Sequence, residues 1–418
     1  MTHDTLLQEL HTLADAGADS LLAQTHAPLL RFDAKEPFFP LAVGYTIFRS
    51  AAKSPSSKFS IDPEGGIAIE YAVWWDWEIQ HLYELEHVWV YLDANGTLAK
   101  VEASAHGTKY PMLRPDDTLP LENGRVTVYS EPGKHGFVPV AQSFESFAGH
   151  IITCCSERAG EDNILTSNPF GAAAFGNPTA FEHRLARRYM QRLAFTPTFD
   201  FNRIFDLRDV PFLTWDKLQT WIPRRINWWR EQLPQRVPHL RLICLDSGDT
   251  LVDEATEVKN GDVTQHASLI PGAADMVRGL QAAGYRLALV ADGPVATFEN
   301  VLRQQYGLWD AFSAFAISET VGVEKPDTRM FHAALNAFDI PQGDYDRVVM
   351  VGNNLERDIK GANALGLISV WISWSPRRSH IPADASEVPD HTIATPLELL
   401  DLLEKIELSL PQINQDAT

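Results

Sequence analysis

Residues 242–251 read LICLDSGDTL, an apolar run that ends in Asp246 and continues through a glycine-containing turn to Thr250. Such a run predicts a buried parallel strand, because strands that are covered on both faces are apolar throughout. Open α/β sheets place their chemistry at the carboxyl ends of their strands. Asp246 is therefore the first candidate nucleophile.

Three further motifs follow in the order that a single site requires. The apolar run 287–290 leads into the sequence Ala-Asp-Gly at 291–293, and the segment VGVEKPD carries Lys325. A last apolar strand, in VVMVGNNLERD, ends before Asn353 and Asp358. Helical stretches separate these motifs, so the pattern predicts a doubly wound parallel sheet whose strand ends meet at one site.

This motif series resembles the haloacid dehalogenase superfamily over roughly residues 238–405. The resemblance implies phosphoryl transfer through an aspartyl-phosphate, with Asp246 as the nucleophile and Lys325 as the neutralising cation. It also implies substrate contacts and a magnesium site. The expected substrate-binding residues are Thr250, Ala291, Asp292 and Gly293, and the expected Mg²⁺ ligands are Asp246, Gly248 through its backbone, Asn353 and Asp358.

The chemistry of the reaction agrees with these assignments. A carboxylate that attacks an anionic phosphoryl group is repelled unless cations lie between the two. Lys325 can supply one positive charge. Mg²⁺ prefers oxygen ligands and can supply the other, held by Asp246, Asp358 and an amide or backbone oxygen.

Three positions depart from the family pattern. Gly248 stands where the family has its general acid, two residues after the nucleophile, and the acidic side chain has moved to Asp249. Asp249 is kept as a candidate catalytic residue, although a shift of one residue on extended chain turns a side chain to the opposite side. Ala291 removes a hydroxyl donor, and Asn353 removes one negative charge from the metal site.

Two classes of function remain open for this half of the chain. The first is a Mg²⁺-dependent hydrolase of the phosphatase type, which Asp246, Lys325 and Asp358 favour. Its substrate would be a phosphorylated small molecule or macromolecule. The second is a catalytically degenerate protein that binds phosphate or a partner, which Gly248 and the other departures favour. Dehalogenation by Asp246 is a weaker third reading, because an acidic metal motif has no use there.

Residues 1–165 predict a β-rich domain with a leading helix. Short β-like runs such as AIEYAVWW, HVWVYL and RVTVYS are separated by turn signals at Asn95-Gly96 and Asn123-Gly124. The stretch HVWVYLDANGTLAKVEA predicts a hairpin. We therefore expect an antiparallel β-sandwich or half-barrel.

A cluster of acidic and histidine side chains lies in this domain. Its members are Asp76, Glu78, His81, Glu84, Glu86, His87, His106 and His135. They could converge on a cation or polar ligand, or they could form the solvated face of a sheet. The domain is similar to the β-sandwich of necrosis-inducing-like and vacuolar-sorting-type proteins in RFDAKEPFFP, ELEHVWVYL, Ser104–Gly107 and Gly133–His135. That resemblance implies a second site near Glu84, Glu86 and His106.

Residues 166–236 predict a helical connector that is interrupted at Pro223 and Pro234. Residues 237–408 form the expected hydrolase domain, and 409–418 are expected to be a disordered tail. The segment from Thr250 to Leu287 has room for only a flap and one helix. We therefore expect a minimal cap, and the N-terminal half is the candidate cover for the site.

Charge and composition exclude several other functions. The net charge of −20 disfavours a nucleic-acid partner, and no apolar run approaches the length of a membrane span. The three cysteines show neither a disulfide framework nor zinc-ligand spacing. The opening stretch MTHDTLLQELHTLADAGADSLL predicts an amphipathic helix rather than a signal peptide. These features lead us to expect a cytoplasmic protein.

Overall fold

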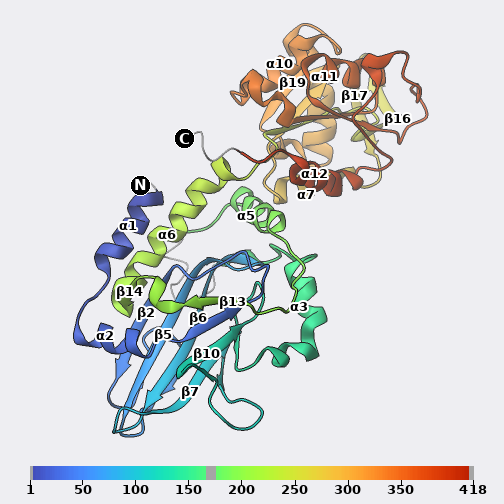
Figure 1. The fold of residues 1–418 in the computed structure, drawn as a ribbon. Coiled ribbons are helices and arrows are strands. Elements are labelled where there is room, and N and C mark those ends of the chain that lie inside the picture. The colour runs from blue at the N-terminus through green and yellow to red at the C-terminus, as the bar shows by residue number, and fades with distance from the viewer. Residues whose placement is uncertain (1–2, 166–175, 414–418) are drawn as a thin grey trace. The chain divides into compact units, whose positions relative to one another are not determined.

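The computed structural model describes residues 3–165 and 176–413 and divides into two compact units (Figure 1). The first unit comprises Met1–Pro178 and Glu182–Arg236. The second comprises Thr179–Phe181 and Val237–Thr418. None of the helices in the described part of the chain is long and apolar enough to cross a membrane.

The second unit is built on a parallel sheet, as the strand-end motifs predict. All five strand pairings in it are parallel. The strands in spatial order are β19 (Ala314–Ile317), β18 (Leu287–Ala291), β15 (Leu242–Leu245), β20 (Val348–Gly352), β21 (Ile368–Ile372) and β22 (His391–Ile393). β15, which precedes the candidate nucleophile, therefore lies in the middle of the sheet.

Hydrophobic cores cover both faces of this sheet. Alternate residues of β15 enter different cores: Ile243 and Leu245 join one, and Leu242 and Cys244 join the other. A strand buried on both sides needs apolar residues throughout, which explains the uninterrupted run in the sequence. The helical segments of the unit are α7 (Ala273–Ala282), α8 (Val295–Phe298), η3 (Glu299–Gln305), η4 (Trp309–Ala311), α9 (Ser318–Val321), α10 (Thr328–Ala337), η5 (Gln342–Arg347), η6 (Leu355–Ile359), α11 (Lys360–Leu365), η7 (Ala385–Glu387) and α12 (Glu398–Ser409).

The insert after the nucleophile consists of a hairpin and one helix. The hairpin pairs β16 (Val252–Asn260) with β17 (Val263–Leu269) in antiparallel fashion, and α7 follows it. This insert agrees with the expected flap and single helix. The hairpin begins only six residues after Asp246, so its first side chains stay close to the strand end.

The first unit contains two larger sheets of mixed strand direction. In one, the order is β11 (Phe137–Val138), β10 (Arg125–Ser130), β1 (Leu29–Phe32) and β13 (Arg203–Asp206), with β9 (Leu121–Glu122) beside β10. In the other, the order is β14 (Phe212–Thr214), β2 (Ala42–Phe48), β5 (Ile67–Trp77), β6 (His81–Leu92), β7 (Leu98–Ala105) and β8 (Thr108–Pro111), with β12 (Asn163–Ile164) beside β6. A small ladder joins β3 (Ala52–Lys53) and β4 (Ser60–Ile61).

The expected hairpin is present, but the purely antiparallel expectation is wrong. β6 and β7 pair in antiparallel fashion across the Asp93–Thr97 turn. The pairs β1 with β10, β14 with β2, and β12 with β6 are parallel. In each of these pairs the two strands come from distant parts of the chain, and short-range sequence patterns cannot predict such pairings.

The expected connector, 166–236, is not a separate helical region. It contributes β13 and β14 to the two sheets of the first unit, along with α5 (Ala180–Arg192) and η2 (Leu207–Asp209). Its residues 166–175 lie outside the described part. α6 (Trp215–Arg236) runs through both prolines, contrary to the expected interruption. Burial of its aromatic face, including Trp221, Trp228 and Trp229, offsets the backbone hydrogen bonds that the prolines remove.

The remaining helices in the described part of the first unit are α1 (His3–Leu13), α2 (Ala18–Thr25), η1 (Ala141–Phe147) and α3 (Ala148–Cys155). The opening stretch thus forms two helices rather than one. The break comes where Asp15 accepts a hydrogen bond from the backbone N–H of Gly17. An aspartate that bonds nearby backbone in this way competes with helix continuation. Of the expected tail, residues 414–418 lie outside the described part.

Candidate functional site

Lys325 joins the two strand-end carboxylates of the second unit. Its Nζ lies 2.6 Å from Oδ1 of Asp246 and 2.6 Å from Oδ1 of Asp358. It also donates to the backbone oxygen of Val290, at 2.9 Å. The side chains of Lys325 and Asp358 are 2% and 1% exposed, so the ammonium is held almost entirely by protein oxygens.

The backbone at the ends of β15 and β20 sets this geometry. The N–H of Asp246 donates to Val351, which fixes the nucleophile's strand against β20. A side chain at Gly352 would collide with the carboxyl group of Asp358, at 2.2 Å from its Cγ. Oδ2 of Asp358 accepts the N–H of Asn354 at 2.9 Å. Gly352 therefore makes room for Asp358 to fold back over the strand end.

The charges of this cluster influence one another strongly. Burial raises the pKa of Asp246, and the positive charge of Lys325 opposes that rise. Burial disfavours the charged form of Lys325, but the carboxylates of Asp246 and Asp358 hold the pKa of Lys325 above its usual value. The lysine is therefore a fixed positive charge beside the nucleophile.

Thr250 and Ala291, two of the expected substrate-binding residues, do not line the pocket of about 210 Å³ beside the strand ends. Both are buried, at 0% and 1% exposure. The Thr250 hydroxyl lies 3.4 Å from Oδ2 of Asp246, so it orients the nucleophile. Ala291 ends β18 with no hydroxyl to offer.

Asp292 and Gly293 do line a pocket of about 210 Å³. Asp292 is tied to the cluster, because its carboxylate accepts the N–H of Lys325 at 2.9 Å and pairs with Arg357 at 3.2 Å. The N–H of Gly293 donates to the Ser318 hydroxyl. A hydrogen bond from the Gly293 N–H to a substrate would therefore compete with Ser318, a residue that the sequence pattern did not reveal.

Asp249 forms an ion pair with Arg377. The carboxylate of Asp249 accepts a hydrogen bond from Nε of Arg377 at 2.8 Å, and Arg377 also forms an ion pair with Asp253 at 2.7 Å. Although burial acts in the opposite direction, Arg377 holds the pKa of Asp249 below its usual value. This geometry does not support the expected catalytic role, since a strongly paired carboxylate is a poor proton donor.

Glu254, at the start of β16, fills the space that a side chain at residue 248 would take. A Cβ on Gly248 would lie 2.2 Å from Oε1 of Glu254. Burial raises the pKa of Glu254, the negative charges of Asp249 and Asp246 add to the rise, and Arg378 opposes it. Glu254 also lines the pocket with Asp292. The sequence analysis missed this residue.

The donor set at the strand ends fits Mg²⁺. Asp246 and Asp358 bring carboxylate oxygens, and Asn353, at 6% exposure, follows β20 directly. The backbone oxygen of Asn353 is taken by the indole N–H of Trp371 at 2.8 Å. Only its side-chain amide oxygen could therefore serve readily as a ligand. A set of hard oxygen donors with few charges suits Mg²⁺, which keeps several waters.

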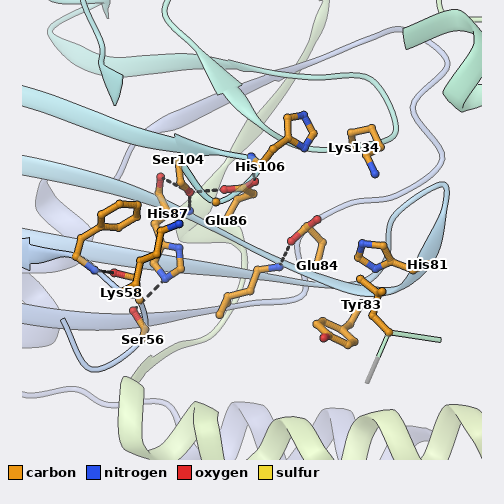
Figure 2. A pocket seen from close by; sticks show the side chains of 15 residues that line it. Ser56, Lys58, His81, Tyr83, Glu84, Glu86, His87, Ser104, His106 and Lys134 are labelled. Carbon is orange, nitrogen blue, oxygen red and sulfur yellow. Dashed lines mark hydrogen bonds between the residues drawn. The ribbon is translucent and has the colours of Figure 1, made fainter. Parts of the chain in front are cut away.

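A second pocket, of about 560 Å³, lies in the first unit (Figure 2). Glu84, Glu86 and His106, expected to share a site, all line it. Glu86 accepts the N–H of His106 at 3.0 Å and is bound by the Ser104 hydroxyl. Burial raises the pKa of Glu86, and the charge of Glu84 adds to the rise. His106 directs its ring to Glu131, at 2.7 Å.

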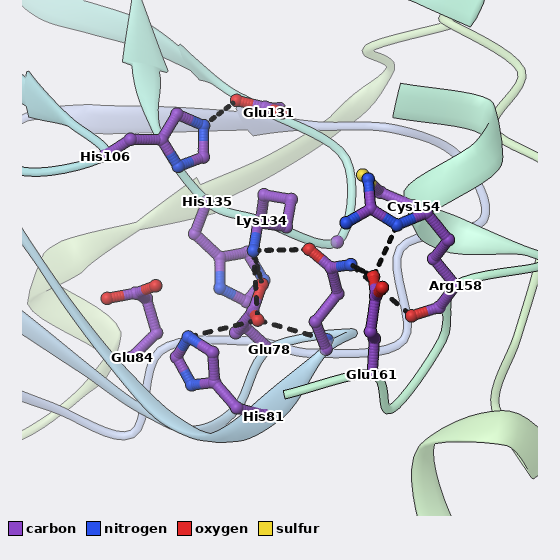
Figure 3. A network of polar contacts seen from close by, with 12 residues as sticks. Glu78, His81, Glu84, His106, Glu131, Lys134, His135, Cys154, Arg158 and Glu161 are labelled. Carbon is purple, nitrogen blue, oxygen red and sulfur yellow. Dashed lines mark hydrogen bonds and ion pairs between the residues drawn. The ribbon is translucent and has the colours of Figure 1, made fainter. Parts of the chain in front are cut away.

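Glu78, His81 and Glu84 form a tighter group beside this pocket (Figure 3). One potential ligand atom from each lies within 4.8 Å of the others. His81 Nε2 is 3.1 Å from Glu78, and Lys134 Nζ approaches the same carboxylate at 3.1 Å. Burial raises the pKa of Glu78 to about 7, with Lys134 opposing the rise.

The other polar residues of the predicted cluster serve the packing of the first unit. Asp76 forms an ion pair with the buried Arg225 of α6 at 2.6 Å. His87 contacts the Ser56 hydroxyl at 3.0 Å and stacks on Trp89. His135 is fully buried and stacks on Trp75, with ring centroids 4.6 Å apart. Of these three side chains, His87 also lines the pocket with Glu84, whereas Asp76 and His135 do not.

Comparison with known proteins finds relatives that are named as phosphatases. Glyceraldehyde 3-phosphate phosphatase of Pyrococcus furiosus is 32% identical over 137 residues, which are 32% of this chain and 55% of that protein. The enzyme of the same name from Methanopyrus kandleri is 30% identical over 168 residues, 40% of this chain and 70% of that protein. The chain thus spans little more than half the length of the first of these relatives.

The hydrolase YfnB of Bacillus subtilis, a solved structure, is 21% identical, with a TM-score of 0.33 over 40% of this chain and 99% of that one. The family model for haloacid dehalogenase-like hydrolases matches residues 90–366, more than half of the chain. The matched range includes Asp246, Lys325 and Asp358. This chain therefore belongs to the haloacid dehalogenase-like hydrolase family.

Proposed function

We propose that the second unit is a Mg²⁺-dependent phosphatase that acts through an aspartyl-phosphate on Asp246. The observation that carries the proposal is the placement of Lys325 Nζ at 2.6 Å from both Asp246 and Asp358. A buried cation shared by two carboxylates suits the attack of one of them on an anionic phosphoryl group. The phosphatase names of the relatives support the same reaction class.

In the first step, Asp246 attacks phosphorus and the ester oxygen leaves. Lys325 offsets the negative charge that gathers between the carboxylate and the phosphoryl oxygens. Thr250 holds the carboxylate in its attacking orientation through the 3.4 Å contact. Bound Mg²⁺ would supply further charge neutralisation, held by Asp246, Asp358, the Asn353 amide and the Gly248 carbonyl. In the second step, water attacks the acyl-phosphate and inorganic phosphate leaves.

The substrate is proposed to be a small phosphorylated metabolite. The pocket beside Gly248 and Asp292 measures about 210 Å³, at the small end of ligand sites. Its lining includes Lys259 of the hairpin, which offers a polar contact to a hydroxylated substrate. The two relatives are named for glyceraldehyde 3-phosphate, which supports a substrate of this class.

A substrate screen tests this proposal. The full chain is incubated with phosphorylated metabolites, nucleotides and an aryl phosphate, with and without Mg²⁺, and phosphate release is measured. Turnover that requires Mg²⁺ is expected. Asp246→Asn should abolish it without unfolding the protein, because the amide is nearly isosteric but cannot attack. Equal turnover by wild type and variant would end the assignment of Asp246.

A degenerate, phosphate-binding protein is the alternative that two observations favour. Ala291 provides no hydroxyl, and the N–H of Gly293 is engaged with Ser318. Calorimetry with inorganic phosphate separates the alternatives when it is combined with the screen. Phosphate binding together with no turnover on any substrate would select the degenerate protein.

For the first unit we propose a divalent-cation site at Glu78, His81 and Glu84. The support is the grouping of two carboxylates and an imidazole within 4.8 Å beside the larger pocket. Lys134 competes for Glu78, so a modest affinity is expected. Calorimetry with Mn²⁺ should show one binding event lost in Glu84→Gln and another lost in Asp358→Asn. Unchanged isotherms in Glu84→Gln would refute the site.

We also propose that the protein is located in the cytoplasm. Cys154, Cys155 and Cys244 are free and buried, which supports a reducing location such as the cytoplasm.

A further inference from the structure

The structure points to a replacement for the general acid that residue 248 lacks, an inference that rests on the proposed phosphatase function. Oε1 of Glu254 lies 2.2 Å from the place of a Cβ on Gly248. The carboxylate of Glu254 thus occupies the space in which an acidic side chain at residue 248 would begin. It does so from the flap, six residues further along the chain.

Asp249 holds Glu254 in this position. Oδ1 of Asp249 accepts a hydrogen bond from the backbone N–H of Glu254 at 3.1 Å. Arg377 donates to Oδ2, the other oxygen of the Asp249 carboxylate. Arg378 lies 3.4 Å from Oε2 of Glu254, so the other oxygen, Oε1, is the one directed at Gly248. Gly248 and Asp249 therefore have two linked effects: Gly248 leaves the space free, and Asp249 fixes the segment whose side chain fills it.

Glu254 is also accessible to a substrate. Its side chain is 32% exposed, and it lines the pocket of about 210 Å³ together with Gly248, Asp292 and Gly293. Ser247, which directly follows the nucleophile in the chain, lines the same pocket. A leaving group in this pocket would therefore lie between the nucleophile's strand end and the Glu254 carboxyl group.

We propose that Glu254 is the proton donor to the leaving group and the proton acceptor from the hydrolytic water. In the first step, the P–O bond to the leaving group breaks as Asp246 bonds to phosphorus, and the Glu254 proton passes to the departing oxygen, which leaves as an alcohol. In the second step, the Glu254 carboxylate takes a proton from water. The resulting hydroxide bonds to phosphorus, the acyl-phosphate P–O bond breaks, and Asp246 and protonated Glu254 are regenerated with inorganic phosphate.

The test compares two leaving groups in the full chain with Mg²⁺ present. The first substrate is the best alkyl phosphate from the screen, whose alcohol needs a proton to leave. The second is 2,4-dinitrophenyl phosphate, whose phenolate leaves without one. Glu254→Gln should lower kcat/KM on the alkyl phosphate by roughly 10²–10³-fold and that on the aryl phosphate by less than about tenfold. A purely structural role for Glu254 would lower both by the same factor.

Glu257→Gln provides the matched comparison. Glu257 lies on the same hairpin and lines the same pocket, so its substitution makes the same change of charge there. Glu257→Gln should change kcat/KM on the two substrates by a similar factor, so that the ratio of the two kcat/KM values stays within about threefold of the wild-type ratio. If Glu257→Gln shifts the ratio as much as Glu254→Gln does, pocket charge rather than proton transfer is responsible, and the proposal is overturned.

A positional rescue gives a second, independent measurement. Glu254→Ala should lose alkyl phosphate turnover and also empty the space beside Gly248. Adding Gly248→Asp to Glu254→Ala should raise kcat/KM on the alkyl phosphate at least tenfold above that of Glu254→Ala, because an acid then approaches from the strand end instead of the flap. Failure to rescue in a folded double variant counts against the shared position. Wild-type protein that turns over neither substrate would refute the phosphatase function itself, whereas active wild type with an unchanged Glu254→Gln would refute only this inference.

Discussion

Replacing Lys325 with methionine should destabilise the second unit strongly. Its Nζ contacts two carboxylates at 2.6 Å, and at an effective dielectric constant of about 20 each contact corresponds to about 6 kcal/mol of Coulomb attraction. Desolvation of the three buried groups cancels much of this gain. What remains is the cost of leaving Asp246 and Asp358 as facing, unpaired carboxylates, which is about 3–5 kcal/mol for a broken buried pair.

The assay is urea unfolding without divalent cations, followed by hydrogen exchange on peptides that cover β15 and β20. Exchange is preferred to fluorescence because buried tryptophans of the first unit, such as Trp221 and Trp228, would mask the second unit. Lys360→Met is the control, since Lys360 Nζ is 3.9 Å from Glu387 and its side chain is 40% exposed. It should cost less than about 1 kcal/mol.

Mg²⁺ should restore part of the stability that Lys325→Met loses, because a divalent cation can replace the ammonium between the carboxylates. The difference in unfolding free energy between wild type and Lys325→Met should also become smaller as the pH falls, since protonation relieves the repulsion between Asp246 and Asp358. If Lys325→Met unfolds at the wild-type urea concentration in cation-free buffer, the ammonium is not the counter-charge that the geometry indicates.

Three further predictions concern the metal site, a buried acid and the two units. Asn353→Asp should bind Mg²⁺ more tightly in calorimetry, because it adds a negative charge to an oxygen-ligand site; weaker or unchanged binding would place residue 353 outside the coordination sphere. Glu78 has its pKa raised to about 7 by burial, so its stabilising contribution in metal-free buffer is complete below about pH 4.5 and is lost as the pH rises to about 7. Glu78→Gln should therefore lack about 3 kcal/mol of that pH dependence in thermal unfolding, whereas the exposed Glu157→Gln should keep it. A fragment of residues 237–418 should fold and bind Mg²⁺ but lose most of its kcat/KM on small substrates if the first unit helps to enclose them; equal activity across the substrate panel would refute that expectation.

The parallel sheet and the central charges could be predicted from the sequence because their signals are local. An apolar run that ends in a carboxylate identifies a strand end wherever it occurs, and parallel strands bring their ends to one edge. Asp246 and Asp358 therefore meet in the structure as their motifs indicate. Lys325 joins them because its motif follows β19 at the same edge.

The parts that could not be predicted depend on contacts between distant segments. Arg377, which neutralises Asp249, lies 128 residues further along the chain. β13 and β14 are four and three residues long and pair with strands from the beginning of the chain. Glu254 is near in sequence, but only the folding back of the hairpin brings its carboxylate to Gly248. The acidic run DEATE at 253–257 was the available signal.

Gly248 and Gly352 are both adjacent to carboxylates, yet they should differ in how they tolerate change. Neither has the positive φ that would require glycine, so space alone restricts them. At Gly352 the obstacle is the buried Asp358, which is itself fixed in the charge cluster. At Gly248 the obstacle is the end of a flexible, partly exposed Glu254 side chain. An acid could therefore be introduced at 248 before or after Glu254 is lost, without reshaping the backbone. The position of the acid is thus open to evolutionary exchange between strand end and flap, while the carboxylate opposite Gly352 is locked in place.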